Sequence, residues 1–268
     1  MNPEDIKISV CIIARNEENF IADCLKSVSP IADEIVLVDT GSTDSTIEIS
    51  QKFNCKIIET TWENDFSKAR NISLDNASHD YILIIDADER LQNPELIKQV
   101  ISLSPENIGG WLIEVTSLAR RKDGSTDSYV SNLLRLFRKL QGVRFSGIIH
   151  EQIIEPIIQS GFKLESTNIK ILHLGYSHNP ELMRQKQLRN LELLDRALEF
   201  NSENGYDIFQ KAKTLLALNR LEEAKEYAIK SIDFLNPDGS VLPQALNYCA
   251  IISFQLNRLD EAIARAKQ

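Results

Sequence analysis

Two aspartates separated by a single residue, Asp86 and Asp88, follow a short apolar segment rich in β-branched residues, residues 81–85. Such a segment indicates a buried β-strand. Residues i and i+2 of extended backbone point to the same side, so we expect the two carboxylates to converge. Paired carboxylate oxygens suit Mg²⁺ or Mn²⁺, ions that commonly also bind a substrate phosphate. The sequence therefore predicts a divalent-metal site at the carboxyl end of this strand.

Polar clusters follow two earlier apolar segments as well. One consists of Ala14, Arg15, Asn16 and Glu17, and the other spans residues 39–44, beginning at Asp39. The carboxyl ends of parallel strands share one edge of a sheet, where open α/β proteins bind ligands. We therefore expect the three clusters to line one cleft.

The first half of the chain alternates between two hydrophobic periods. Period-two or continuous apolar segments predict strands at residues 8–13, 35–38, 56–59 and 81–85, and helical spacing predicts helices at residues 19–28, 46–53 and 66–77. Asp44, or a neighbouring hydroxyl, and Asp65 are expected to cap the second and third helices. This alternation predicts an α/β fold with a mainly parallel, doubly wound sheet. Further strands are predicted at residues 111–115, 133–137 and 169–172, with a turn at 122–125.

From about Pro180 onward, strand signals give way to amphipathic helices rich in Leu, Ala, Glu and Lys. Residues 218–224 and 256–262 match closely, which gives a period of 38 residues, near the 34 residues of the tetratricopeptide helix-turn-helix repeat. Two unrelated amphipathic hairpins are the alternative. We expect a first domain over residues 1–178 and a helical tetratricopeptide-like region over residues 179–268. Because stacked repeats need neighbours or a cap, we also expect this chain to be truncated.

Composition narrows the class of protein. The 268 residues carry a net charge of −9 and are 43% hydrophobic, so we expect a folded chain that does not bind nucleic acid. The four cysteines show no CxxC spacing, which argues against a zinc knuckle or a redox pair. Neither a signal peptide nor an apolar run of transmembrane length is present, so the chain is expected to be cytoplasmic.

Four segments together resemble the N-terminal half of family-2 glycosyltransferases of the GT-A fold, and the resemblance covers roughly residues 6–178. They are residues 9–17 (SVCIIARNE), 38–46 (VDTGSTDST), 69–71 (ARN) and 86–89 (DADE). A catalytic domain followed by tetratricopeptide units is also similar to bacterial glycosyltransferases, including some that modify peptides. The resemblance implies a metal-dependent inverting transferase that uses a nucleotide-sugar, with uridine as the base. It implies a peptide, protein or glycan acceptor, with a protein partner or self-association through the repeats.

The resemblance also implies roles for individual residues. Residues Ala14 to Glu17 line the base and ribose, and Asp39 accepts a hydrogen bond from the base, unless it caps the strand end. Arg70 approaches the diphosphate or the base. Asp86 contacts the ribose and the metal, and Asp88 is the main metal ligand, so that the bound ion neutralises the departing nucleoside diphosphate.

Two further positions complete the implied site. In residues 145–151 (FSGIIHE) we expect Glu151 to take the proton from the acceptor, with His150 as the alternative base. His173 lies in residues 172–176 (LHLGY) and corresponds to a third metal ligand of some relatives, although a structural histidine is equally compatible with an apolar strand.

Two other classes of protein stay open at this point. A sugar-phosphate nucleotidyltransferase also combines a metal with an α/β sheet, but it usually carries a Gly-rich loop that residues 14–17 lack. A non-catalytic peptide-binding module with a degenerate scaffold is the other alternative, and the presence of Asp39, Asp86 and Asp88 argues against it. Turnover of a nucleotide-sugar distinguishes these classes.

Overall fold

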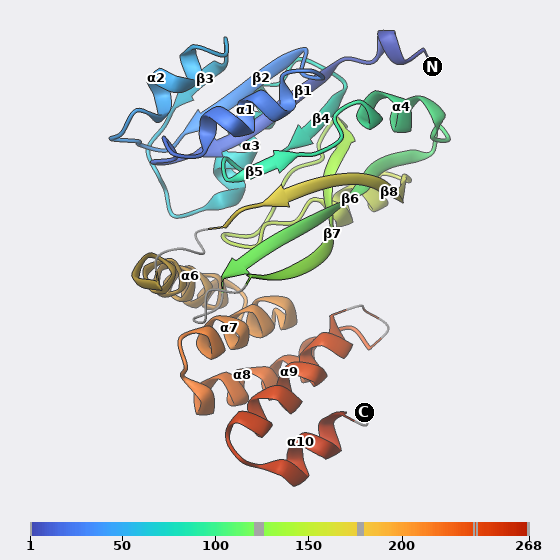
Figure 1. The fold of residues 1–268 in the computed structure, drawn as a ribbon. Helices are drawn as coiled ribbons and strands as arrows, with labels where there is room; N and C mark the ends of the chain where they lie inside the picture. The colour runs from blue at the N-terminus through green and yellow to red at the C-terminus, as the bar shows by residue number, and fades with distance from the viewer. Residues whose placement is uncertain (1, 121–125, 176–179, 238, 240, 267–268) are drawn as a thin grey trace. The chain divides into compact units, whose positions relative to one another are not determined.

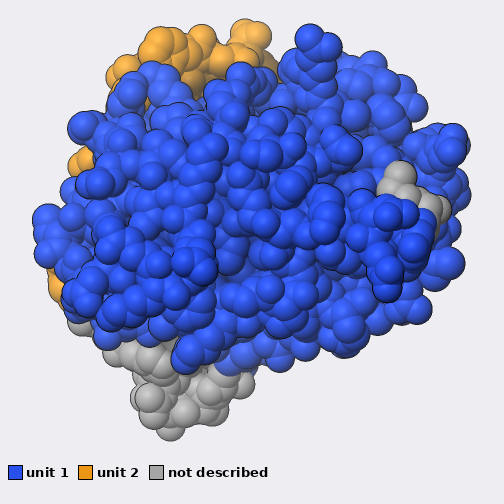
Figure 2. Space-filling model, turned by 90° about the horizontal axis from the view of Figure 1, so that it is seen from above, with its two compact units in different colours: residues 1–178 blue, residues 179–268 orange. Residues whose placement is uncertain are grey.

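The computed structural model describes residues 2–120, 126–175, 180–237, 239 and 241–266. The chain divides into two compact units, residues 1–178 and residues 179–268, which are coloured separately in Figure 2. Each unit is described by itself. No helix of the described ranges is long and apolar enough to cross a membrane.

Within the described ranges, the first unit forms one sheet of eight strands in the order β3-β2-β1-β4-β7-β6-β8-β5 (Figure 1). The strands are β1 (Ile8–Ala14), β2 (Glu34–Asp39), β3 (Lys56–Glu59), β4 (Tyr81–Ile84), β5 (Glu89–Leu91), β6 (Ile108–Arg120), β7 (Thr126–Arg138) and β8 (Lys163–His173). Strands β3, β2, β1 and β4 run parallel, as do β6 and β8. Strand β7 is antiparallel to β4 and β6, and β5 is antiparallel to β8. The predicted mainly parallel α/β fold is confirmed.

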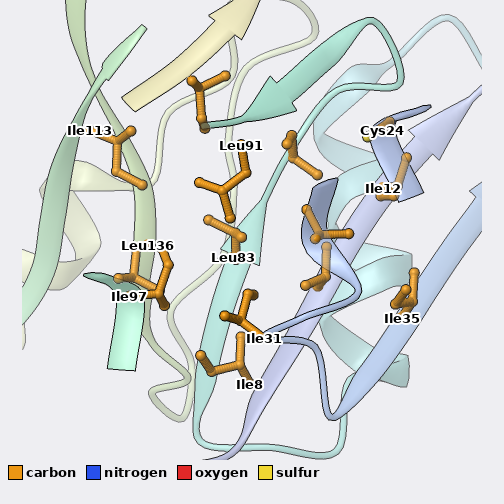
Figure 3. Packing of buried hydrophobic residues seen from close by; sticks show 14 of the residues in the cluster. Ile8, Ile12, Cys24, Ile31, Ile35, Leu83, Leu91, Ile97, Ile113 and Leu136 are labelled. Atoms are coloured by element: carbon orange, nitrogen blue, oxygen red, sulfur yellow. The ribbon is translucent and has the colours of Figure 1, made fainter. Parts of the chain in front are cut away.

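Helices cover both faces of this sheet. They are η1 (Pro3–Asp5), α1 (Ile21–Val28), α2 (Thr46–Gln51), α3 (Phe66–Asn76), α4 (Leu96–Leu103) and α5 (Ile154–Gln159). Side chains of a strand point alternately to the two faces. Ile12 of β1 therefore packs in one cluster with Cys24 of α1 and Ile97 of α4, and Figure 3 shows this layer. Cys11 packs in the other cluster, with residues of α3 and α5.

Local sequence signals predicted the first half of this unit well. Asp65 caps α3 by accepting a hydrogen bond from the Lys68 N–H at 3.0 Å, and Asp44 accepts one from the Thr46 N–H at 3.0 Å. The second half differs, because β6, β7 and β8 extend well beyond the predicted segments, and α4, α5 and β5 were not predicted. The outer part of β7 is exposed and places the adjacent Tyr129 and Val130 among polar residues, so hydrophobic alternation does not mark it. The turn predicted at residues 122–125 lies outside the described residues.

The second unit consists of stacked helices. They are α6 (Pro180–Phe200), α7 (Gly205–Ala217), α8 (Leu221–Phe234), α9 (Leu242–Gln255) and α10 (Leu259–Ala266). The two turns of the sequence repeat are alike, since Asn219 and Asn257 have φ angles of 60° and 59°. In both turns the next residue donates its N–H to a carbonyl five residues earlier, at 2.9 Å. This equivalence confirms the tetratricopeptide-like character of the helical region.

Gly205 begins α7 where the helix touches the end of α8. A Cβ at this position would lie 2.6 Å from the carbonyl carbon of Phe234, which is backbone and cannot rotate away. We therefore expect Gly205→Ala to lower the free energy of unfolding of the helical unit by roughly 1–3 kcal/mol through overpacking. Ser202→Ala, an exposed position nearby, is the control and should change the value by less than about 0.5 kcal/mol. Urea unfolding followed by circular dichroism measures both, and equal stabilities would contradict the packing described here.

Candidate active site

Asp86 lies directly after β4, at the carboxyl edge of the parallel strands, and two arginines hold its carboxylate. Its Oδ1 accepts a hydrogen bond from Arg70 Nη2, and its Oδ2 accepts one from Arg135 Nη2 at 2.9 Å. The same Arg135 nitrogen donates to Glu89 Oε1 at 2.6 Å, and Glu89 Oε2 accepts from the Asp86 N–H at 2.9 Å. Segments from α3, β4, β5 and β7 therefore meet in one cluster of charges.

Burial makes the electrostatics of this cluster strong. Burial by itself raises the pKa of Asp86, but the charges of Arg135 and Arg70 outweigh it and hold that pKa well below its usual range. Burial raises the pKa of Glu89 to about 7, and the nearby Asp86 charge adds to the rise while Arg135 opposes it. Asp86 is therefore an anion that the two arginines stabilise, whereas Glu89 gains a proton readily.

Two neighbouring residues of α3 hold the segment that contains Glu151. Arg70 Nε donates to Glu151 Oε1 at 3.1 Å. Asn71 bonds both backbone groups of Phe145, donating to its oxygen and accepting from its N–H, each at 2.9 Å. Glu151 Oε2 has no donor among the residues that the structure describes, and the side chain is 15% exposed. The neighbouring His150 adopts a φ of 53°, so the backbone turns sharply before Glu151.

Asp88 and His173 come together through the pairing of β5 with β8. His173 Nε2 lies 3.3 Å from Asp88 Oδ2, and His173 Nδ1 lies 3.1 Å from Ser117 Oγ of β6. The hydrogen bond with Asp88 raises the pKa of His173, against the opposing effect of burial. The ring is therefore held from both sides with one nitrogen facing a carboxylate.

These donors fit a divalent cation in part. Within the described ranges, no group of three or more His, Cys, Asp or Glu side chains could hold a metal ion. Asp88 and His173 offer an oxygen and a nitrogen on one side, whereas both oxygens of Asp86 are taken up by guanidinium groups. A Mg²⁺ or Mn²⁺ bound by one or two side chains normally completes its coordination with substrate phosphates and water.

The polar segments that follow β1 and β2 are joined to each other by hydrogen bonds. The Asn16 N–H donates to Ser42 Oγ at 2.9 Å, and the Glu17 N–H donates to Thr46 Oγ1 at 2.7 Å. Ala14 is buried and Arg15 is exposed.

Asp39 is 1% exposed, and its Oδ1 accepts from the N–H groups of Gly41 and Ser42 at 2.9 and 2.8 Å. Ser42 Oγ donates to Asp39 Oδ2. Asp39 thus caps the strand end in this structure, and its contact with a base stays a prediction.

The structure also brings in residues that the sequence analysis did not single out, chiefly Arg135, Glu89, Asn71 and Ser117. Arg135 interrupts an apolar strand between leucines, in residues 133–137, and a charge in such a strand must be paired. The sequence therefore indicated that Arg135 is paired, but it did not identify the residues that pair with it. Ser117 and Asn71 are ordinary polar residues whose roles depend on strand register and on a loop 74 residues away.

Comparisons with known proteins agree with this geometry. The family described as glycosyl transferase family 2 matches residues 9–109. A TPR repeat-containing protein of Synechococcus elongatus is 27% identical over 97% of this chain and 64% of its own length. The SPbeta prophage-derived glycosyltransferase SunS of Bacillus subtilis is 31% identical over 84% of this chain and 53% of its own length. The chain thus spans between about half and two thirds of these relatives.

Solved structures show the same fold. The structure of residues 1–349 of TarS from S. aureus superposes with a TM-score of 0.52 at 16% identity, covering 98% of this chain and 90% of that one. The first unit is therefore an α/β domain with the GT-A fold. Residues 9–109 match glycosyl transferase family 2, and a tetratricopeptide-like helical region follows the α/β unit.

Arg135 is the cation that Asp86 and Glu89 share. Arg135→Met removes it and leaves Glu89, which is buried, and Asp86, whose side chain is 34% exposed, with less compensation, so we expect a loss of up to about 3–5 kcal/mol in the free energy of unfolding. Arg144→Met, which breaks the exposed pair with Asp75, is the matched control and should cost at most about 1 kcal/mol. Denaturant unfolding of both variants at pH 8 makes the comparison, and a similar small loss in each would refute the buried network.

Proposed function

We propose that this chain is the catalytic part of an inverting glycosyltransferase that moves a sugar from a nucleotide-sugar to a peptide, protein or glycan acceptor. The supporting observation is that Asp86 and Asp88, between β4 and β5, and Glu89, the first residue of β5, lie at the carboxyl edge of the parallel strands in a domain that matches glycosyl transferase family 2. SunS carries the name glycosyltransferase, and TarS has been solved in complex with UDP-GlcNAc, which supports a nucleotide-sugar donor with uridine as its base.

Each of the two arginines in the charge cluster keeps a donor that an anionic ligand could accept a hydrogen bond from. Arg70 Nη1 and Arg135 Nε are buried and have no acceptor among the described residues. An unsatisfied buried donor costs about 1–3 kcal/mol, and a bound anion removes that cost. A nucleoside diphosphate at this edge places its oxygens within reach of such donors. In this proposal Asp86 holds the two arginines in position, and the segments after β1 and β2 line the nucleoside.

A divalent cation belongs to the same proposal. A mannosyltransferase from Pyrobaculum calidifontis with the same fold (TM-score 0.52, 14% identity) was solved with GDP-Man and Mn²⁺. In this chain Asp88 and His173 would hold Mn²⁺ or Mg²⁺, and the bound ion would neutralise the charge that develops on the leaving diphosphate. Ser117 orients the His173 ring from the other side, as partners of metal-binding histidines normally do.

In this proposal Glu151 takes the proton of the acceptor. Arg70 fixes one carboxylate oxygen, and the other has no donor among the described residues, so it is available to an incoming hydroxyl or thiol. Direct displacement at the anomeric carbon requires that proton to leave as the new bond forms, and this single displacement inverts the configuration. His150 lies beside Glu151 and is the alternative base.

Removal of one carboxylate tests the metal proposal. Asp88→Asn should weaken UDP binding roughly tenfold or more in the presence of Mn²⁺, because a charged ligand of the ion is lost, and should leave binding in EDTA unchanged. Asp23→Asn, on the exposed side of α1, is the control and should behave as the wild type. Titration calorimetry supplies the dissociation constants. If the wild type binds UDP equally well in EDTA and in Mn²⁺, the metal has no role in donor binding.

The base is tested by exchanging Glu151 for its amide. Glu151→Gln keeps the shape of the side chain, so UDP should still bind, while hydrolysis and transfer of the sugar should slow by ~10²–10⁴-fold. His150→Ala should slow them much less. With a thiol acceptor the loss at Glu151 should shrink, because a thiol of pKa near 8.5 is already partly ionised at neutral pH. Rates of UDP release from UDP-sugars decide between the two residues, and the opposite ranking would assign the base to His150.

A further inference from the structure

Among the residues that the structure describes, most of strand β7 has a pairing partner along one edge alone. Its pairing with β6 runs from Thr126 to Phe137, whereas the described pairing with β4 covers Leu136 to Arg138. The backbone of residues 128–135 makes no hydrogen bond to described residues beyond the β6 ladder. An edge with free N–H and C=O groups is a template for another extended chain.

Exposed apolar side chains project from this free edge. The exposed fractions are 60% for Tyr129, 59% for Val130 and 41% for Leu133. Tyr129 and Leu133 are four residues apart on a strand and therefore share one face, while Val130 lies on the other. An incoming strand would meet apolar contacts on both of its faces, which suits alternating side chains better than it suits a sugar chain.

The register connects this edge with the candidate active site. Tyr129 pairs with Ser117, Ser117 pairs with His173, and His173 pairs with Glu89, so a single row crosses β7, β6, β8 and β5. Neighbouring strands are ~4.8 Å apart, which places Tyr129 about 10 Å along this row from His173. The exposed aromatic ring is therefore a near neighbour of the proposed metal ligands.

The other end of the edge reaches the charge cluster directly. The register shifts between Trp111 and Leu112, and this shift leaves Arg135 without a partner on β6. Its side chain bonds Asp86 and Glu89 instead. A peptide that lies along β7 from Tyr129 to Arg135 spans about 20 Å. Its end lies beside the charge cluster, in which Arg70 also bonds Glu151.

We propose that residues 128–134 of β7 bind an extended peptide segment of the acceptor by strand addition. This inference rests on the proposed function and specifies its acceptor class as a peptide. Backbone hydrogen bonds would supply affinity, and contacts with Tyr129, Val130 and Leu133 would supply selectivity. The bound strand would bring the hydroxyl or thiol of one residue next to Glu151.

The probe is a pool of synthetic eleven-residue peptides, each with one central Ser, Thr or Cys between alternating apolar and polar residues. UDP-glucose and UDP-GlcNAc serve as donors, and mass spectrometry detects the transfer. The double variant Tyr129→Lys, Leu133→Lys should lower kcat/KM for the modified peptides by roughly tenfold or more, since lysines at an edge oppose strand addition. The dissociation constant for UDP should stay at the wild-type value. Leu103→Lys, a 76% exposed leucine at the end of α4, is the control and should change neither quantity.

A backbone scan of the peptide needs no protein variant. Added strands use the N–H groups of every second residue, so N-methylation at successive positions should abolish transfer with a period of two. If N-methylation has the same effect at every position, strand addition is wrong. It is also wrong if the wild type forms a concentration-dependent dimer that the double variant does not form, because the edge is then an interface between copies of the chain. If UDP-sugars are hydrolysed but no peptide is modified, the peptide inference fails and the proposed function stands. If neither UDP nor a UDP-sugar binds, both fail.

Discussion

The ion pairs of Asp86 with Arg70 and Arg135 are the interaction on which the rest of the candidate active site depends. Charges taken out of water are stable only when each one is compensated, so loss of one partner exposes the full desolvation cost of the others. Here the ion pairs also fix the positions of the segments that carry the charged residues. Arg70 belongs to α3, Arg135 to β7 and Glu89 to β5, and Arg70 also holds Glu151. One cluster thereby positions four segments that are distant in sequence.

This arrangement divides the work between two carboxylates that the sequence presents as a pair. Asp86 is committed to the arginines, whereas Asp88 faces His173 and remains suited to a cation. In the proposed function, Asp86 holds the two arginines while Asp88 holds the cation. Asp86 and its neighbours occupy only part of the hydrogen-bonding capacity of the arginines, and the proposed function assigns the remaining donors to a diphosphate.

The sequence predicted what local chemistry controls. The β-α order, the Asp65 cap and the 38-residue repeat were all readable, because capping, periodicity and turn residues act over short distances. Contacts between side chains that are distant in sequence could not be predicted. Arg135 was visible as a charge in an apolar strand, yet its two carboxylates come from another strand and from the turn before it. For Asp39 the sequence predicted the position at a strand end correctly. Its carboxylate nevertheless accepts hydrogen bonds from the turn that follows the strand.

In the proposed function, a nucleoside diphosphate binds at this edge between the arginine pair and the Asp88–His173 pair. The decisive measurement is a crystal structure of the chain with UDP and Mn²⁺, with anomalous diffraction recorded for manganese. We expect a manganese peak within bonding distance of Asp88 Oδ and His173 Nε2, with diphosphate oxygens accepting hydrogen bonds from Arg70 or Arg135 while Asp86 keeps its arginine partners. Nucleotide bound elsewhere, or manganese bound away from both Asp88 and His173, would contradict it.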